Sequence, residues 1–334
     1  MTQASPALPA PIPAGPRERA AEWFQVLADL GERIGIAFGR VDASGAPEWF
    51  DLAHTDFDGV GGLAHLLRGR GMRCAALPEL ARPERPGLLR WLRILRKDPS
   101  GERHPTVAWR RFDPATRPAG PAPWPAWKLL GPDETRRLEA RAEQEGASTN
   151  SLLLSALQRA LVPLLVEGSP PRPGLWMVPV NMRGAVRSAR DTANQSAYLT
   201  VEMGPAPSPK EAHAAVKAAL ADDLHWASWL QAVASRWIGR RLYGRLLRSY
   251  WSRPRHPWLG AFSNLGEWPP GGEAGEDGTA GWVFAPPTVK TIPVAAGAIG
   301  WRGRLGLALR VHPALGGPAD ALAWHSAWLE ALEV

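Results

Sequence analysis

The stretch of this sequence best suited to chemistry is the hexapeptide His-Thr-Asp-Phe-Asp-Gly at residues 54–59. Its histidine, His54, stands four residues before Asp58, and Gly59 follows directly. A histidine with an ordinary pKa near about 6.5 accepts a proton at neutral pH, so His54 is a candidate general base. The pattern is short enough to arise by chance. Its meaning therefore depends on the elements that hold it and on the other motifs of the chain.

A β-hairpin is expected to place His54. Residues 33–40 and 47–53 are short apolar or alternating runs, and the Asp-Ala-Ser-Gly turn at 42–45 separates them. Residues 61–70 predict a helix directly after the motif. The histidine is thus expected at the end of a strand, before a turn into a helix.

Composition narrows the class of protein. The 334 residues are 45% hydrophobic and 21% charged, as in a globular protein of two lobes or one large domain. The single cysteine, Cys74, excludes an internal disulfide framework and a multi-thiolate metal site, and it fits a cytoplasmic location. The net charge of +7 indicates an affinity for anions, which could be nucleic acid, a phosphorylated cofactor, an acidic carrier protein or an anionic membrane.

The chain divides at its Pro-rich stretches. Residues 1–18 are expected to be a disordered Ala/Pro-rich tail, 19–112 an N-terminal lobe, 113–128 a Pro-rich linker and 129–334 a C-terminal lobe. Helices and strands are mixed throughout, which indicates an α/β protein. The periodicity predicts helices over 20–30, 86–97, 135–145, 151–166 and 320–332, and a helical region with at least one break over 211–252. It also predicts strands over 174–180, 196–202, 261–266, 291–300 and 304–312, and a loop over 267–281.

Two further motifs follow the first in order: Val-Pro-Val-Asn-Met-Arg-Gly at 178–184 and Phe-Ser-Asn-Leu-Gly at 262–266. Together the three resemble the thioester-dependent acyltransferase superfamily, which includes condensation domains, alcohol O-acetyltransferases and wax-ester synthases. Its hallmark is HHxxxDG or HxxxDG, and here Ala53 replaces the first histidine. The resemblance implies a two-lobe chloramphenicol-acetyltransferase-like fold with mixed sheets flanked by helices and an active-site tunnel between the lobes. Relatives carry a longer segment before the histidine, so the N-terminal lobe is expected to be reduced.

The resemblance also implies roles for the motif residues. His54 would be the general base, whereas Asp58 would pair with Arg183 and hold the histidine loop, so that no His–Asp dyad forms. Gly59 would allow a close approach, or it is an ordinary turn glycine. The candidates for polar groups that line the tunnel are Asn181, Ser263 and Asn264. For Asn181, bonding to local backbone is the alternative.

The activity implied is transfer of an acyl group to a hydroxyl or amine, in lipid or secondary-metabolite biosynthesis. The donor would be acyl-CoA or a phosphopantetheinyl carrier protein, the acceptor a small molecule or lipid, and no cofactor would be bound permanently. No metal-ligand spacing, GxGxxG, P-loop or GxSxG motif is present, so a metal site, nucleotide binding and a serine hydrolase have no support. The alternative, motivated by Ala53 and the short first lobe, is a catalytically inert condensation-like module that binds a carrier protein or assembly partner.

Two stretches, 88–97 and 235–258, combine arginine with tryptophan. They predict amphipathic helices, and three readings stay open. The helices could contact an anionic membrane surface, dock an acidic carrier protein or CoA phosphates, or simply expose arginines while their tryptophans pack inside. RNA binding is disfavoured because no RNA-binding module is recognisable.

Overall fold

The computed structural model describes residues 19–72, 74, 77–80, 85–97, 107, 109–117, 122–165, 174–186, 188–230, 239–251, 258–268 and 278–334. The structural statements below concern these residues. The expected tail over 1–18 and parts of the linker and of the second basic stretch lie outside them.

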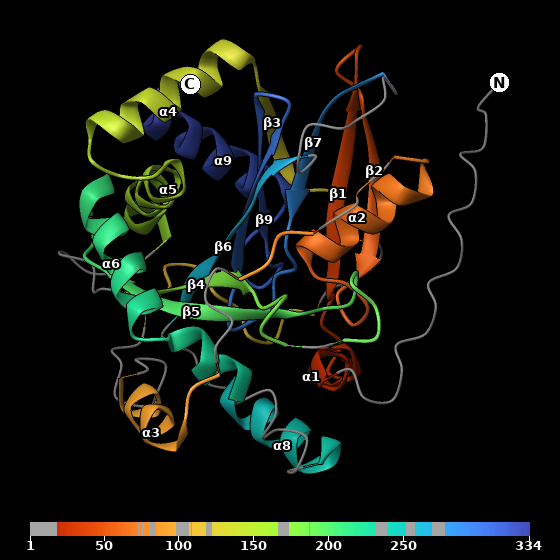
Figure 1. Ribbon diagram of the computed structural model, residues 1–334, viewed down its shortest axis with the longest axis vertical. Helices are drawn as coiled ribbons and strands as arrows, with labels where there is room; N and C mark the ends of the chain where they lie inside the picture. The colour runs from red at the N-terminus through yellow and green to blue at the C-terminus, as the bar shows by residue number, and fades with distance from the viewer. Residues whose placement is uncertain are drawn as a thin grey trace.

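The strands form two sheets (Figure 1). They are β1 (Gly35–Asp42), β2 (Pro47–Ala53), β3 (Ala126–Leu130), β4 (Gly174–Asn181), β5 (Ser196–Met203), β6 (Trp258–Trp268), β7 (Thr279–Ala285), β8 (Val294–Trp301) and β9 (Arg304–Val311). The smaller sheet has the order β2-β1-β7 and is antiparallel. The larger has the order β3-β9-β8-β6-β4-β5 and is mixed, because β6 runs parallel to both β4 and β8.

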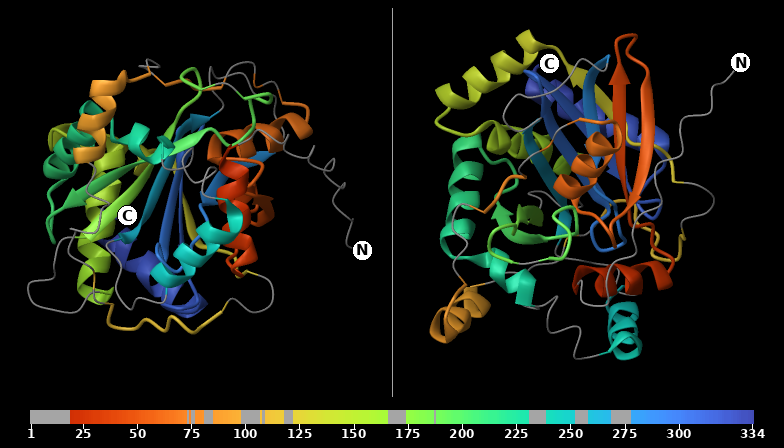
Figure 2. Two further views of the ribbon diagram at one scale, coloured as in Figure 1. Left: turned by 90° about the horizontal axis from the view of Figure 1, so that it is seen from below. Right: turned by 45° about the vertical axis from the view of Figure 1, so that its right-hand side comes forward.

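Helices flank both sheets. They are α1 (Arg19–Asp29), α2 (Gly59–Gly69), α3 (Leu88–Lys97), α4 (Pro132–Gln144), α5 (Thr149–Leu165), α6 (Pro209–Ala221), α8 (Arg240–Trp251) and α9 (Pro318–Leu332). Helices α4, α5, α6 and α9 cover one side of the larger sheet, while α2 packs on β1 of the smaller one (Figures 1 and 2). Helices α1 and α8 pack against each other at one end of the molecule, and α3 lies at the same end but apart from them (Figures 1 and 2). No helix in the described part of the chain has the length and apolar character needed to span a bilayer.

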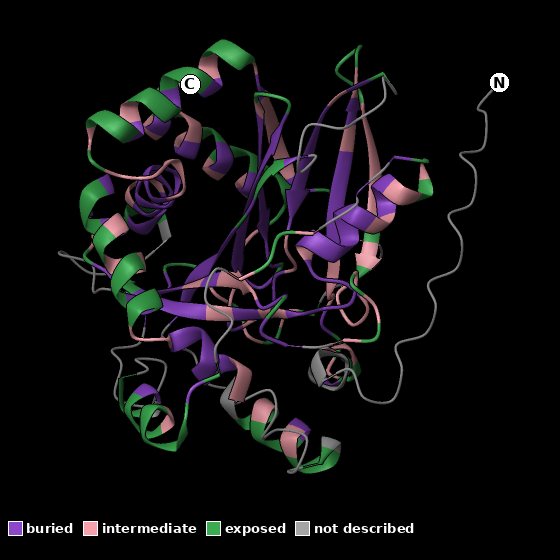
Figure 3. Cartoon of the chain, viewed as in Figure 1, coloured by how far each residue is buried: buried purple, intermediate pink, exposed green. Residues whose placement is uncertain are grey.

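Strand β7 joins the two sheets. It pairs with β1 and also packs on β8 and β9. Two glycines permit this approach, because a Cβ at Gly297 or Gly306 would lie 2.0 Å from the carbonyl oxygen of Phe284 or Trp282, respectively. Every residue of β8 is buried, as expected for a strand covered on both faces (Figure 3).

The predicted hairpin is confirmed: β1 and β2 pair antiparallel, with Gly35 opposite Ala53. The predicted helical region over 211–252 is interrupted, as expected, and becomes α6, a helical segment over 224–230 and α8. Two strands were not predicted. β3 starts inside the expected Pro-rich linker. β7 starts at Thr279, within the last residues of the stretch 267–281 that was expected to be a loop.

The lobes are consequently not simple consecutive segments. The sheet that holds the histidine motif takes β7 from the range 129–334, which the sequence assigned as a whole to the C-terminal lobe. Only the pairing of β7 with β1 shows to which sheet β7 belongs, because the residues of a strand do not specify its pairing partner.

Candidate active site

His54 lies directly after β2, where the hairpin ends. Its backbone N–H donates to the carbonyl of Ile34 at 3.1 Å, and the following turn closes with a 3.2 Å bond from the Phe57 N–H to the Ala53 carbonyl. The imidazole Nδ1 lies 2.7 Å from the carbonyl oxygen of Phe57. A carbonyl oxygen can only accept, so this contact places a proton on Nδ1. Neutral His54 therefore carries its lone pair on Nε2.

The surroundings of His54 favour the neutral ring. Burial lowers the pKa of the imidazole, while the bond to Phe57 and the charge of Asp58 act in the opposite direction with smaller effect. The ring of Phe24, on α1, lies 4.1 Å from the imidazole between centroids. A histidine with a lowered pKa is unprotonated at neutral pH, the state that a general base requires.

The carboxylate of Asp58 forms an ion pair with Arg183. Its two carboxylate oxygens accept from Nη1 and Nη2 of Arg183 at 2.9 and 3.0 Å, and the side chains are only 4% and 5% exposed. The same carboxylate caps α2, accepting from the Gly61 N–H at 2.7 Å, and accepts from the Gln195 N–H at 2.8 Å. This is the pairing that the resemblance implied. It connects the histidine loop to residues that follow β4.

Arg183 uses every donor of its guanidinium. Besides Asp58, it donates to the carbonyls of Asp191 and Ala193, at 2.8 and 2.9 Å, and to Oδ1 of Asn181 at 3.0 Å. A buried arginine with all donors matched is held in one orientation. The ion pair is therefore rigid.

Asn181 takes the local position that the sequence left as an alternative. Its Oδ1 accepts from the backbone N–H and Nη1 of Arg183, and its amide donates to the Pro78 carbonyl. Both ends of the amide are engaged, so Asn181 supports Arg183. A tunnel-lining role for Asn181 stays a prediction.

Sequence reasoning missed Asn194. Its Nδ2 donates to the backbone carbonyl of His54 at 2.9 Å and lies 3.2 Å from Nδ1 of the ring. Its Oδ1 accepts from the Ser196 N–H and hydroxyl, which fixes the amide orientation. No motif marks this residue, since it lies in a loop 140 positions after His54.

Two glycines in or next to the motif allow neighbouring groups to approach the backbone closely. A Cβ at Gly59 would lie 2.6 Å from a methyl of Leu265, so Gly59 serves a close approach to β6. Gly61 is more constrained, because its Cβ would lie 2.0 Å from the carbonyl oxygen of Thr192 and 2.9 Å from Nη2 of Arg183. Gly61 was not singled out from the sequence.

The remaining two candidates for tunnel-lining groups, Ser263 and Asn264, differ in burial. Ser263 is buried on β6, opposite Gly297 of β8. Asn264 is exposed on β6, where the pairing with β8 becomes irregular, and its Oδ1 accepts from the Gly266 N–H at 2.9 Å. A tunnel-lining role for Asn264 stays a prediction. A tunnel that reaches His54 stays a prediction.

Comparison with known proteins supports the fold. No protein-family model matches the chain, and no curated protein matches it in sequence. Solved structures do match, and they confirm the predicted α/β fold of two sheets flanked by helices. The smaller sheet is antiparallel rather than mixed.

Three of these structures illustrate the likeness. The EpoB NRPS cyclization-docking bidomain from Sorangium cellulosum is 12% identical with a TM-score of 0.53, over 85% of this chain and 59% of that one. Polyketide synthase associated protein 5 from Mycobacterium tuberculosis is 17% identical with a TM-score of 0.51, over 86% and 73%. The TRI3 trichothecene 15-O-acetyltransferase from Fusarium sporotrichioides is 14% identical with a TM-score of 0.49, over 96% and 75%. The chain thus spans only part of each of these proteins.

Proposed function

We propose that this protein is an acyltransferase. It moves an acyl group from a thioester donor, acyl-CoA or an acyl carrier protein, to a hydroxyl or amine acceptor, with His54 as general base. The observation that carries the proposal is the 2.7 Å contact between Nδ1 of His54 and the Phe57 carbonyl, which leaves Nε2 as the basic atom. The lowered pKa of the same ring adds to it.

In the proposed reaction, Nε2 takes the proton of the acceptor as its oxygen or nitrogen attacks the thioester carbonyl carbon. The tetrahedral intermediate then collapses, the carbon–sulfur bond breaks, and the imidazolium returns the proton to the leaving thiolate. General-base catalysis of this kind contributes about 10²–10⁴-fold. The ion pair of Asp58 and Arg183 keeps the histidine loop in place, and Asn194 holds the His54 backbone. Ser263 remains our candidate for a polar group that orients the thioester.

The partners follow from the same proposal. Proteins of similar fold include parts of an NRPS and a polyketide synthase associated protein, which supports a carrier-bound or CoA-bound donor. The acceptor would be a small molecule or lipid of secondary metabolism. No permanently bound cofactor and no nucleic acid enter the scheme.

The test is transfer by the purified protein, with acyl-CoA and acyl carrier protein as donors and a panel of alcohols and amines as acceptors, followed by mass spectrometry. His54→Ala should lower turnover at least about 100-fold, as loss of a general base requires. His213→Ala is the matched control, since His213 lies on α6 and contacts Ser151. Product formation by His54→Ala at the wild-type rate would remove His54 from the mechanism.

One observation favours the second candidate, an inert condensation-like module. The Phe24 ring lies against the His54 imidazole, and Ala53 occupies the place of the first motif histidine. An inert module would bind an acyl carrier protein without forming any product, and His54→Ala would bind it equally well. Product formation that depends on His54 would exclude this candidate.

We further propose that α3 contacts a membrane surface. Leu88, Leu89 and Leu92 are 76%, 84% and 54% exposed, beside the basic residues Arg96 and Lys97. The opposite face of α3 packs against the protein, where Ile94 is 1% exposed. The expectation of a helix with one packed face is therefore correct for the Ile94 side, but not for the side of the three leucines. Sedimentation with anionic vesicles should be reduced by replacing the three leucines with serine. Equal sedimentation of the wild type and this variant would refute the contact.

A further inference from the structure

A buried arginine on β9 has donors left over. The side chain of Arg310 is 7% exposed, and its Nη1 donates to the Gly35 carbonyl at 2.8 Å. Its Nε and Nη2 are buried and have no hydrogen-bond partner among the described residues. A buried guanidinium with two unmatched nitrogens is costly, because it has lost water without a replacement. Such a group is stable only when something else supplies the acceptors.

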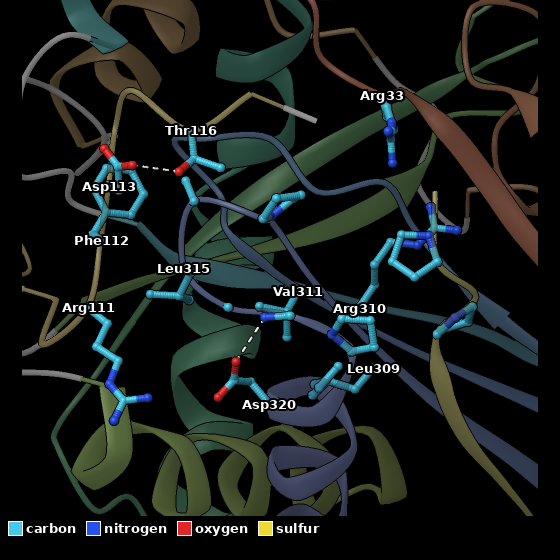
Figure 4. Close-up of a pocket in the computed structure, with 18 of the residues that line it drawn as sticks. Arg33, Arg111, Phe112, Asp113, Thr116, Leu309, Arg310, Val311, Leu315 and Asp320 are labelled. Carbon is cyan, nitrogen blue, oxygen red and sulfur yellow. Dashed lines mark hydrogen bonds between the residues drawn. The ribbon is translucent and has the colours of Figure 1, made fainter. Parts of the chain in front are cut away.

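A cavity opens at this arginine. It has a volume of about 900 Å³ and lies between residues 111–117 and 123–125 on one side and 309–321 on the other. Four arginines line it: Arg33, Arg111, Arg117 and Arg310. Figure 4 shows Arg33 and Arg310 extending toward the same end, with Arg111 at the opposite side. Phe112 and Trp124 add aromatic surface to the wall.

The acids that line the cavity are engaged elsewhere. Asp113 accepts from the Thr116 hydroxyl at 2.6 Å and from the Ala115 N–H at 2.9 Å, in a turn of its own. Asp320 caps α9 by accepting from the Gly317 N–H at 2.8 Å (Figure 4). Neither forms an ion pair with a lining arginine among the described residues. The cavity therefore holds four cations and two acids that serve local structure.

One more acid acts on Arg310 from outside the lining. Burial lowers the pKa of the Arg310 guanidinium, Asp51 of β2 raises it, and Arg33 lowers it. Asp51 is within electrostatic reach but forms no ion pair with Arg310. An arginine stays protonated even so. Arg310 therefore keeps its positive charge and has no carboxylate in an ion pair with it among the described residues.

We infer that this cavity is a binding site for a small amphiphilic oxyanion, held through its carboxylate or phosphate by Arg310. Nε–H and Nη2–H lie on the same edge of the planar guanidinium and match two oxygens of such a group. Both nitrogens are buried in the structure, so binding requires the Arg310 side chain to turn this edge toward the cavity. Arg33 adds charge at the same end, and Phe112 and Trp124 face the apolar body of the ligand. The site does not depend on the chemistry of His54, so it stands or falls separately from acyl transfer.

Thermal melts of the full chain test the inference, at constant ionic strength. The probes are 4-phenylbutyrate, phenyl phosphate and the neutral 4-phenylbutanol. At least one anion should raise Tm by an amount that grows with the logarithm of its concentration, to about 4 °C at one hundred times Kd, and the alcohol should not. The anion that acts at lower concentration identifies the head group. A Tm that neither anion raises beyond the effect of the alcohol would overturn the site.

Variants place the binding at the cavity. Arg310→Met should weaken anion binding at least about tenfold, and so should Arg310→Lys, which keeps the charge but loses the two-donor edge. Arg136→Met on α4 removes a charge from an exposed ion pair and should bind like the wild type. Because Arg310→Met could fail to fold, Arg33→Met provides a second measurement, with binding weakened at least about threefold. Unchanged binding in both Arg310→Lys and Arg33→Met would refute the assignment.

Discussion

Replacing Arg183 by methionine offers the sharpest test of how the histidine loop is held. The substitution keeps an unbranched side chain but removes both bonds to Asp58. The Asp58 side chain is only 4% exposed. Asp58 would keep the N–H groups of Gly61 and Gln195 but lose the only cation that pairs with it in the described structure. A buried carboxylate without its counter-ion is strongly unfavourable.

The expected magnitude follows from burial and chain length. Removing one member of a buried ion pair costs about 3–5 kcal/mol in the free energy of unfolding. An unfolding entropy of about 2.1 cal/mol/K per residue, applied to 334 residues, gives about 0.7 kcal/mol/K for unfolding as one unit. Arg183→Met should therefore lower Tm by about 4–7 °C.

Calorimetry with a double-mutant cycle provides the assay. Arg136→Met is the control, because its ion pair with Asp133 is 71% and 84% exposed, and it should change stability by less than about 0.5 kcal/mol. Asp58→Asn should also destabilise the protein, and the double variant should lose less than the sum of the single losses. If Arg183→Met melts with the wild type, or if the two losses simply add, the ion pair does not hold the loop.

The remaining predictions concern pH and packing. An ordinary histidine is half protonated at about pH 6.5, and burial lowers the pKa of His54 below this value. Transfer activity should therefore still be at its plateau when the pH falls to 6.5. A loss of activity that begins at or above pH 6.5 would contradict this. Asn194→Asp would place a carboxylate 3.2 Å from Nδ1, raise that pKa and move the acid limb to higher pH, as a pH–rate profile would show. Gly61→Ala should cost about 1–3 kcal/mol in urea denaturation, because its Cβ would lie 2.0 Å from the Thr192 carbonyl, and wild-type stability would rule out this contact. Burial lowers the pKa of His325 to about 4 in the folded state, below its unfolded value of 6.5. The unfolded chain therefore takes the proton first, and about 3 kcal/mol of stability should be lost between pH 6.5 and 4. His325→Gln should remove that part of the loss, and an unchanged acid sensitivity would refute it.

Local patterns predicted much of this architecture. The turn at Asp42–Gly45 and the alternation around it were enough for the hairpin that ends at His54, because both signals lie within a few residues. The resemblance supplied the partner of Asp58, which lies 125 residues away. No local pattern could have supplied it.

The parts that were missed are those fixed by distant contacts. Asn194 is an ordinary loop asparagine in the sequence, and only the fold brings it to His54. Strand β7 follows a Gly-rich stretch, and its role becomes visible only through its pairing with β1. For Asn181 the sequence left a tunnel position and local bonding open, and the structure shows that neighbouring groups use both ends of its amide.

The position of β7 has a consequence for the order in which the chain is made. The sheet that carries His54 is complete only when residues 279–285 have left the ribosome, more than two hundred residues after β1. Until then β1 has a free edge, able to pair with other chains. Pairing over such a separation also slows folding. A nascent chain that stops before β7 should therefore be prone to aggregate, and the sheet that carries His54 should depend on chaperones until β7 emerges.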